Sequence, residues 1–290
     1  MSAHKKPNRI PQLFSAKRKS SSANGLRTQF TYGEVLDSGS AIDLVCDAQN
    51  QDPHLYVLHH GREVVAPEFR IGTRVFYPGV LSAGVQAAVR FPESSIGYRS
   101  AERLFSALKA LFLTSGFEAS VALATSFWSL ANWFTDVLPA APTLMISGPA
   151  PEAGFLLDLL SCVARRGLFI GELTPGAVRS LPMQIRPTLL INAGEIDSVS
   201  RKLVRVTSRR RAFIGRSGKL LNLYCAKAIY CGVVGDFSAI TEALHVRLPP
   251  IGRLPVLDEI RGNEIAREFR PSCVRIAHAI FFKCAVRSLM

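Results

Sequence analysis

At 290 residues with 48% hydrophobic content, the chain is long enough to bury a substantial core, as one larger or two smaller domains. Its formal net charge of +13 favours a polyanionic partner, with nucleic acid ahead of a membrane surface. Six cysteines without a C-x-x-C pair, and no histidine pair at metal-ligand spacing, favour reduced core thiols in a reducing cytoplasm over disulfides or a metal site.

Residues 1–27 contain seven lysines and arginines and no acidic side chain. This composition predicts a basic disordered tail, because such a segment cannot bury a core. The tail also lacks the apolar segment of a signal peptide. Two uses stay open for it: an arm that contacts phosphates without specificity, or a solvated leader with no role.

Residues 28–80 are predicted to form a small β-rich module. Short apolar runs at 42–46, 54–59 and 74–77 are separated by turn residues, which is typical of an antiparallel sheet. His59 and His60 are adjacent and would point to opposite faces of a strand, so the pair does not predict a metal site.

Residues 81–140 are predicted to form a helical region. The segment 101–113 is amphipathic, and Ser100 is placed to act as its N-cap. The stretch 117–137 is strongly apolar, but serine, threonine and asparagine interrupt it. We therefore expect a helix buried against a sheet and no transmembrane span.

The next region, residues 141–250, follows the order of a phosphate-binding loop. An apolar run at 143–146 leads through a loop rich in glycine and proline into an apolar helical pattern. Such a loop holds phosphate with backbone N–H groups at a helix N-terminus, a lysine, and a hydroxyl that binds Mg²⁺. Gly148, Pro149 and Gly154 are its candidate residues here, but Phe155 occupies the lysine position and Leu156 the hydroxyl position.

Two further strands are predicted at 168–170 and 187–192, with a helix between them that Thr174 could start. The later strand ends at Asn192, where an active NTPase would carry acidic residues for Mg²⁺ and the attacking water. Glu195 follows closely, so a displaced carboxylate stays open, and Asn192 and Glu195 complete the candidate nucleotide site. The sequence contains no G-x-S-x-G, H-E-x-x-H or G-x-G-x-x-G motif, and no catalytic residues are assigned.

Taken together, these segments resemble a bacterial family of helicase-like P-loop ATPase domains, found in primase–helicase proteins of phages, plasmids and other mobile genetic elements. The resemblance covers residues 127–250 and is most specific at Thr174-Pro and at Arg186-Pro-Thr-Leu-Leu-Ile. It implies an α/β fold with a P-loop NTPase-like sheet flanked by helices. The family's Lys, Thr, Asp and Glu are absent here, and its late Asp-Arg falls on Thr241 and Glu242. The resemblance therefore implies a chain that keeps the fold of the family but has lost its hydrolysis site and binds no cofactor. The alternative is that it binds ATP with Mg²⁺.

Residues 201–219 carry eight basic side chains and no acidic one. Helical spacing would place Arg201, Arg205 and Arg209 on one side. Such a stripe is suited to salt-sensitive contacts with phosphates and has no base readout, which favours non-specific DNA binding. Anchoring of a neighbouring subunit is the competing use. The candidate nucleic-acid residues are Arg201, Arg205, Arg209, Arg210, Arg211, Arg216 and Lys219.

A hairpin is expected over 213–224, further strands at 228–234 and 244–250, and a helical C-terminal tail over 251–290. Three functions remain open. The favoured one is a degenerate, non-hydrolysing protein associated with helicases or primases that binds nucleic acid or a replication partner through basic surfaces. The others are an active ATPase with a displaced nucleotide site, and a structural partner protein or homo-oligomer whose charge serves assembly.

Overall fold

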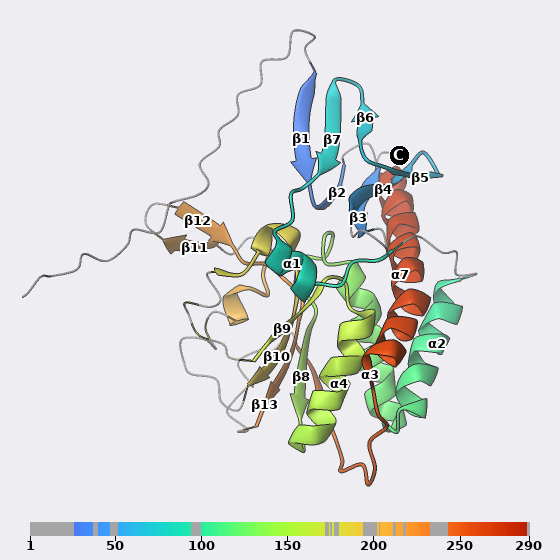
Figure 1. The fold of residues 1–290 in the computed structure, drawn as a ribbon, viewed down its shortest axis with the longest axis vertical. Coiled ribbons are helices and arrows are strands. Elements are labelled where there is room, and N and C mark those ends of the chain that lie inside the picture. The colour runs from blue at the N-terminus through green and yellow to red at the C-terminus, as the bar shows by residue number, and fades with distance from the viewer. Residues whose placement is uncertain are drawn as a thin grey trace, which may run out of the picture.

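A five-stranded parallel sheet forms the centre of the molecule, with helices packed against it and a β-rich module at one end (Figure 1). This arrangement confirms the predicted α/β class, with a sheet flanked by helices and a small N-terminal β-rich module. The structure is a computed structural model that describes residues 26–36, 40–46, 52–93, 100–171, 174, 176, 180–193, 202, 204–210, 213–216, 219–232 and 243–288. Most of the predicted basic tail, residues 1–25, lies outside the described residues.

The central sheet has the spatial order β14-β8-β13-β10-β9, and all its pairings are parallel. In chain order its strands are β8 (Thr143–Ser147), β9 (Gly167–Ile170), β10 (Thr188–Ala193), β13 (Lys227–Cys231) and β14 (Ala243–Arg247). The strand order reverses beside β8. Open α/β sheets bind their ligands at such a point, outside the carboxyl ends of the strands.

Hydrophobic cores lie on both faces of this sheet, which explains why its central strands read as continuous apolar runs. Leu144 and Ile146 of β8 face the larger core, whereas Met145 between them faces the smaller one. The same alternation places Leu190 of β10 in the larger core and Ile191 in the smaller one. Successive side chains of a strand point to opposite faces, so each strand contributes to both cores.

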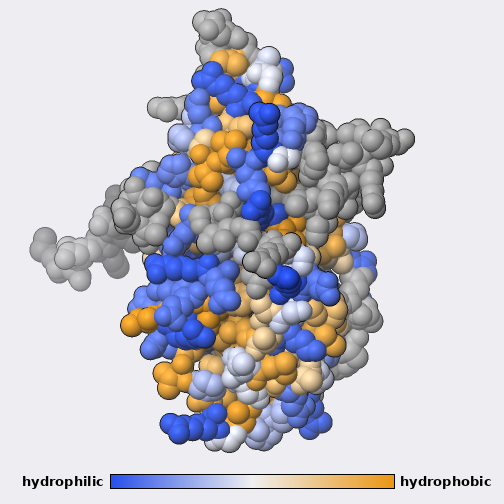
Figure 2. All heavy atoms as spheres, turned by 90° about the vertical axis from the view of Figure 1, so that its right-hand side faces the viewer, coloured by the Kyte–Doolittle hydropathy of each residue, from blue (hydrophilic) through white to orange (hydrophobic). Residues whose placement is uncertain are grey.

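The larger core is covered by α2 (Ala101–Thr114), α3 (Ala119–Trp133), α4 (Ala150–Val163) and α7 (Glu259–Ser288). Ser100 caps α2 as predicted, because its hydroxyl accepts a hydrogen bond from the Arg103 N–H at 3.2 Å. Trp128 and Trp133 of α3 are fully buried, and the Trp133 indole donates to the Val163 carbonyl at 3.0 Å. The face that bears α2 and α7 mixes apolar and polar residues (Figure 2). The prediction of a helix buried against the sheet is confirmed.

No helix among the described residues combines the length and the apolarity that a bilayer crossing requires. The long C-terminal helix α7 contains Pro271, which has no N–H to donate to the carbonyl of Arg267. Phe269, Cys273 and Val274 of α7 are nevertheless buried in the larger core, so the helix is held by packing.

The N-terminal module contains two sheets. The first, in the order β2-β3-β4-β5, is antiparallel as predicted, and its strands are β2 (Gly33–Val35), β3 (Ala41–Cys46), β4 (Pro53–His59) and β5 (Arg62–Ala66). The second, in the order β1-β7-β6, consists of β1 (Arg27–Thr31), β6 (Phe69–Ile71) and β7 (Arg74–Pro78). Here β1 pairs with β7 in parallel, which corrects the expectation of a purely antiparallel module. The two strands lie far apart in the chain, so local turn signals could not reveal their pairing.

A buried network of ion pairs joins this module to the central domain. Asp43 of β3 contacts Arg165 at 3.0 Å and also pairs with Arg166, both just after α4. Asp136 contacts Arg165 at 2.6 Å and Arg186 at 2.5 Å. Burial alone would raise the pKa of Asp136, but the guanidinium groups of Arg165 and Arg186 hold it below its ordinary value. The network is therefore ionised and fixes the module to the sheet.

Shorter elements lie between the main ones, among them the short helix η1 (Met183–Ile185). The predicted hairpin is present as β11 (Phe213–Arg216) and β12 (Lys219–Asn222), an antiparallel pair that lies at the side of the central sheet (Figure 1). A six-residue helix, α1 (Ala83–Ala88), begins at Ser82. The helix expected from Thr174 falls mostly on residues outside the described part of the chain.

Candidate nucleotide and nucleic-acid sites

The candidate nucleotide site lies at the carboxyl end of β8, where the chain enters α4. Only Gly148 and Pro149 separate strand from helix, so the loop is much shorter than a phosphate-binding loop. Gly148 has φ +127°, a conformation that glycine adopts readily. A Cβ at this position would lie 2.4 Å from the Leu248 carbonyl oxygen, and the Leu248 N–H donates to the Ser147 carbonyl at 2.8 Å. The loop is therefore pressed against the chain that follows β14.

Backbone donors are sparse at the start of α4. Pro149 and Pro151 have no N–H, so they interrupt the run of amide donors that a phosphate cradle uses. The carbonyl of Gly148 is also engaged, because the Tyr230 hydroxyl donates to it at 3.3 Å. The short loop thus offers neither the room nor the consecutive donors of an anion cradle.

A carboxylate of the chain itself occupies the first turn of α4. Glu152 is only 6% exposed, and its Oε1 accepts a hydrogen bond from the Ile251 N–H at 2.8 Å. Its Oε2 is buried without a hydrogen-bond partner among the described residues. The N-terminus of a helix favours negative charge, and Glu152 supplies that charge from within. A phosphate that approached this helix would meet a like charge.

The other candidate residues lie near the same end of β8. Gly154 lies beside Asn192, since a Cβ on the glycine would be 3.9 Å from the Asn192 side-chain nitrogen. The candidate residues Gly148, Pro149, Gly154 and Asn192 therefore gather at one edge of the sheet, whereas Glu195 lies outside the described residues. At the lysine position, the Phe155 ring stacks against Phe117 with centroids 5.9 Å apart.

One lysine is buried at the opposite edge of the sheet. Lys227 is the first residue of β13, at the amino ends of the strands, and is fully buried. Its ammonium donates to the Ser208 hydroxyl at 3.1 Å, and burial lowers its pKa from the ordinary value of 10.5. Because the loop after β8 lies at the carboxyl ends, Lys227 cannot replace the missing phosphate-binding lysine.

The basic segment, residues 201–219, follows the predicted helical stripe only in part. Residues 204–206 are helical, and Arg205 is exposed. The helical spacing does not reach Arg209, which lies in an isolated bridge with Ala140. The helix ends because the Thr207 hydroxyl donates to the Val204 carbonyl at 2.7 Å, and the Ser208 hydroxyl donates to the same carbonyl at 3.2 Å.

Of the predicted nucleic-acid residues, Arg205, Arg209 and Arg210 are exposed. Arg201 and Arg211 lie outside the described residues, as do the side chains of Arg216 and Lys219. The backbones of the last two face each other next to the hairpin turn, where β11 ends and β12 begins. We call Arg205, Arg209, Arg210 and the β11–β12 hairpin the basic surface.

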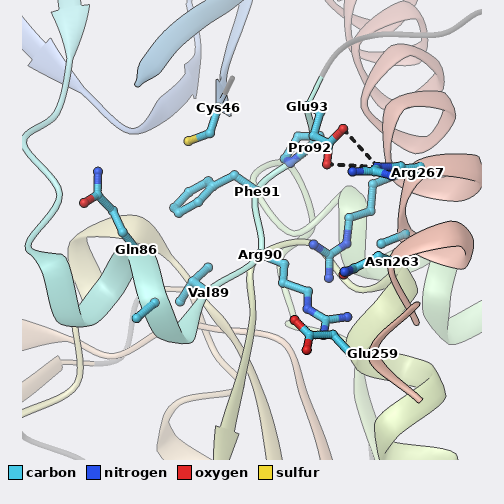
Figure 3. Close-up of a pocket in the computed structure, with 13 residues that line it drawn as sticks. Cys46, Gln86, Val89, Arg90, Phe91, Pro92, Glu93, Glu259, Asn263 and Arg267 are labelled. Atoms are coloured by element: carbon cyan, nitrogen blue, oxygen red, sulfur yellow. Dashed lines mark hydrogen bonds and ion pairs between the residues drawn. The ribbon is translucent and has the colours of Figure 1, made fainter. Parts of the chain in front are cut away.

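A separate polar pocket of about 390 Å³ lies between the N-terminal module, α1 and α7 (Figure 3). Its arginines already have partners within the chain. Arg267 contacts Glu93 at 3.3 Å, and the buried Arg270 donates to the Cys162 carbonyl at 2.8 Å. Burial lowers the pKa of Arg270 to about 10. Arg270 therefore ties α7 to the end of α4, whereas Arg267 ties α7 to the segment that follows α1.

The described part of the chain also shows where the potential metal ligands and the cysteines lie. No group of three or more potential metal ligands occurs among the described residues. Five cysteines, Cys46, Cys162, Cys225, Cys231 and Cys273, are buried as free thiols, as predicted. Burial raises the pKa of Cys46 to about 11, so this thiol is held in its protonated, unreactive form.

Comparison with known proteins gives weak structural neighbours. No family model matches the sequence, and no curated protein matches it. The C-terminal region of NrS-1, in its apo form, has a TM-score of 0.39 and 10% identity, over 86% of this chain and 72% of that one. A full-length MCM homologue from Methanopyrus kandleri has a TM-score of 0.39 and 11% identity, over 81% of this chain and 56% of that one. Likeness at this level does not assign a function.

Proposed function

We propose that this chain is a non-hydrolysing protein of P-loop NTPase-like fold that binds nucleic acid through its basic surface. The binding is non-specific with respect to sequence, and DNA is the favoured ligand. One observation carries the proposal: the helix that would receive a phosphate is neutralised by the buried carboxylate of Glu152, whereas Arg205, Arg209 and Arg210 face solvent. Exposed cations are therefore available to an external polyanion, whereas the first turn of α4 carries a carboxylate.

The chemistry of the basic surface supports single-stranded or double-stranded phosphate backbones as ligands. Arginine presents a planar fork of donors to phosphate oxygens and stays charged at every physiological pH. The hairpin adds two exposed apolar side chains, Phe213 at 51% and Leu220 at 73%, and Leu220 lines the same cavity as Arg210. Single-strand binders combine cations with exposed aromatic rings that stack bases.

The two other functions that the sequence leaves open predict different behaviour. An active ATPase would require a lysine and a carboxylate to reach the loop after β8, and the short loop between Ser147 and Ala150 leaves no cradle for them to complete. A structural partner protein or a subunit of a helicase or primase assembly would use the same arginines against acidic side chains. Such a protein would bind no nucleic acid.

The test is a salt titration of binding to a fluorescent oligonucleotide, read by fluorescence anisotropy. Each phosphate contact contributes about 0.7 (single strand) to 0.9 (duplex) to the slope of log affinity against log salt. The double variant Arg209→Ala/Arg210→Ala should lower affinity on all sequences alike and reduce the slope by about 1 to 2.

A matched control has the same net charge. Arg103→Ala/Arg253→Ala removes two exposed arginines outside the basic surface and should leave the slope at the wild-type value. Equal losses in both double variants would mean that total charge, and no particular surface, drives binding. Absence of binding even at low salt, with self-association in solution, would favour the structural partner or homo-oligomer instead.

A further inference from the structure

A cavity of about 400 Å³ adjoins the basic surface at the amino ends of the sheet strands. It lies between the short helix η1 (Met183–Ile185), which precedes β10, and the segment from β12 to Tyr224, which precedes β13. The cavity is therefore at the opposite edge of the sheet from the loop after β8. Its volume falls within the range of small-molecule sites in proteins.

The cavity has a cationic side. Arg186 reaches it from the left-handed residue that ends η1, with its side chain 42% exposed, and one of its nitrogens donates to Asp136. Asp136 does not neutralise this side, because it is shared with Arg165. The buried network as a whole has three guanidinium groups against two carboxylates, which leaves one positive charge in excess.

Arg210 adds a second cation. It is exposed, lines the cavity, and has no ion-pair partner among the described residues. Its backbone is fixed, because the Arg210 N–H donates to the Pro139 carbonyl at 3.3 Å and Arg209 bridges to Ala140. Tyr224 closes the same side, since its hydroxyl donates to the Leu138 carbonyl at 2.7 Å. The two arginines are thus presented by a rigid rim.

Besides the groups already named, the lining of the cavity is apolar apart from two amide side chains. Met183, Leu220 and Leu223 line it from two different segments. Asn222 lies at the edge, and its side-chain oxygen accepts from the Tyr224 N–H at 2.9 Å, which leaves its amide nitrogen free to donate. Gln184, exposed on η1, completes the edge. A flat heterocycle that packs against the apolar side chains could form hydrogen bonds with the amide groups of Asn222 and Gln184.

From these features we infer that the cavity takes one unstacked nucleotide of a single strand. Its phosphate lies on Arg186 and Arg210, and its base lies against Met183, Leu220 and Leu223. The inference rests on the proposed function and adds to it a ligand class, single-stranded nucleic acid. A paired base in a duplex is not available to such a cavity, whereas a splayed base in a single strand is.

The experiment distinguishes the contribution of the base to the affinity from that of the phosphate backbone. Wild-type protein is titrated against a labelled oligothymidylate of about a dozen nucleotides, the same backbone with abasic sites, and a duplex of equal length; free thymidine monophosphate is the competitor. Abasic substitution should weaken binding about five-fold or more, the range expected for loss of a base contact. The ribose counterpart, oligouridylate, should behave like the thymidylate.

Two tryptophan variants test the cavity itself. Gln184→Trp places a large side chain at the cavity mouth and should remove the preference for the intact oligonucleotide over the abasic one. Ser106→Trp, at an exposed position of α2, is the control and should keep the preference. Far-ultraviolet circular dichroism establishes that both variants fold.

Three results would overturn the inference. Equal affinity of wild-type protein for intact and abasic strands would remove the base from the site but leave nucleic-acid binding intact. Competition by the free monophosphate alone, without a strand preference, would identify a mononucleotide site. Failure to bind any oligonucleotide at low salt would end the proposed function, and this inference with it.

Discussion

The buried ion network allows a quantitative prediction about how the N-terminal module is held. Asp43 accepts from Arg165 at 3.1 Å through Nε and lies 3.0 Å from its Nη2, and it also pairs with Arg166 and accepts from the Leu44 N–H. Asp43→Asn keeps the shape of the side chain and removes its charge. Arg166 then has no carboxylate partner among the described residues, while Arg165 keeps Asp136.

The side chains of Asp43, Arg165 and Arg166 are at most 5% exposed, so solvent cannot compensate for the lost charge. Loss of one member of a buried pair typically costs about 3 to 5 kcal/mol, because the remaining charge is buried without a partner. We expect Asp43→Asn to lower the free energy of unfolding by that amount.

The assay is equilibrium unfolding in urea, followed by the fluorescence of the buried Trp128 and Trp133. Glu68→Gln is the control, since it breaks a pair with Arg70 in which the Glu68 and Arg70 side chains are 36% and 61% exposed, and it should have only a small effect on stability. If Asp43→Asn costs no more than this control, the network does not hold the module as argued.

Three further predictions concern single positions. Burial lowers the pKa of Lys227 below 10.5, so the unfolded chain binds more protons between the two values and stability should rise as pH rises toward 10.5. Lys227→Met should remove that rise and stabilise the protein by about 1 kcal/mol or more near neutral pH, as measured by urea unfolding across pH; an unchanged pH profile would contradict this. Gly148→Ala should lower the free energy of unfolding by more than about 1 kcal/mol, because its Cβ would collide with the Leu248 carbonyl; a neutral result in thermal unfolding would refute the close approach. Glu152→Ala leaves the Ile251 N–H without its acceptor and should cost about 1 to 3 kcal/mol by the same method, without creating ATP binding.

Much of the central domain could be predicted from local sequence patterns. The apolar run at β8, the proline-rich loop and the helical pattern of α4 each have a period or turn chemistry that acts over a few residues. The hairpin of β11 and β12 was accessible for the same reason. Phe155, which occupies the lysine position, is buried in the larger core.

The closure of the site could not be predicted in this way. Glu152 and Ile251 are 99 residues apart in sequence, and Tyr230 lies 82 residues from Gly148. Such contacts depend on which strands become neighbours in the sheet, and periodicity within one segment carries no information on that. An acidic residue in the first turn of a helix is a common stabilising feature, so Glu152 alone gave no signal of its contact with Ile251.

The course of the chain in the basic segment, residues 201–219, also could not be predicted from local patterns. Its charge was evident, but the helical stripe that was predicted ends before Arg209. Thr207 and Ser208 divert the chain by donating to the Val204 carbonyl, and Ser208 is held in turn by the buried Lys227. The diversion brings Arg210 to the rim of the cavity near the hairpin, a position that helical spacing would not have given.

The most direct test of the central claim is a calorimetric titration of the wild-type protein with ATP and Mg²⁺ up to millimolar nucleotide. If Glu152, Pro149 and Pro151 have replaced the anion cradle, the titration gives no saturable heat and no Mg²⁺-dependent binding. Saturable, Mg²⁺-dependent binding that is lost in Gly154→Glu, together with turnover of the bound ATP, would contradict the claim.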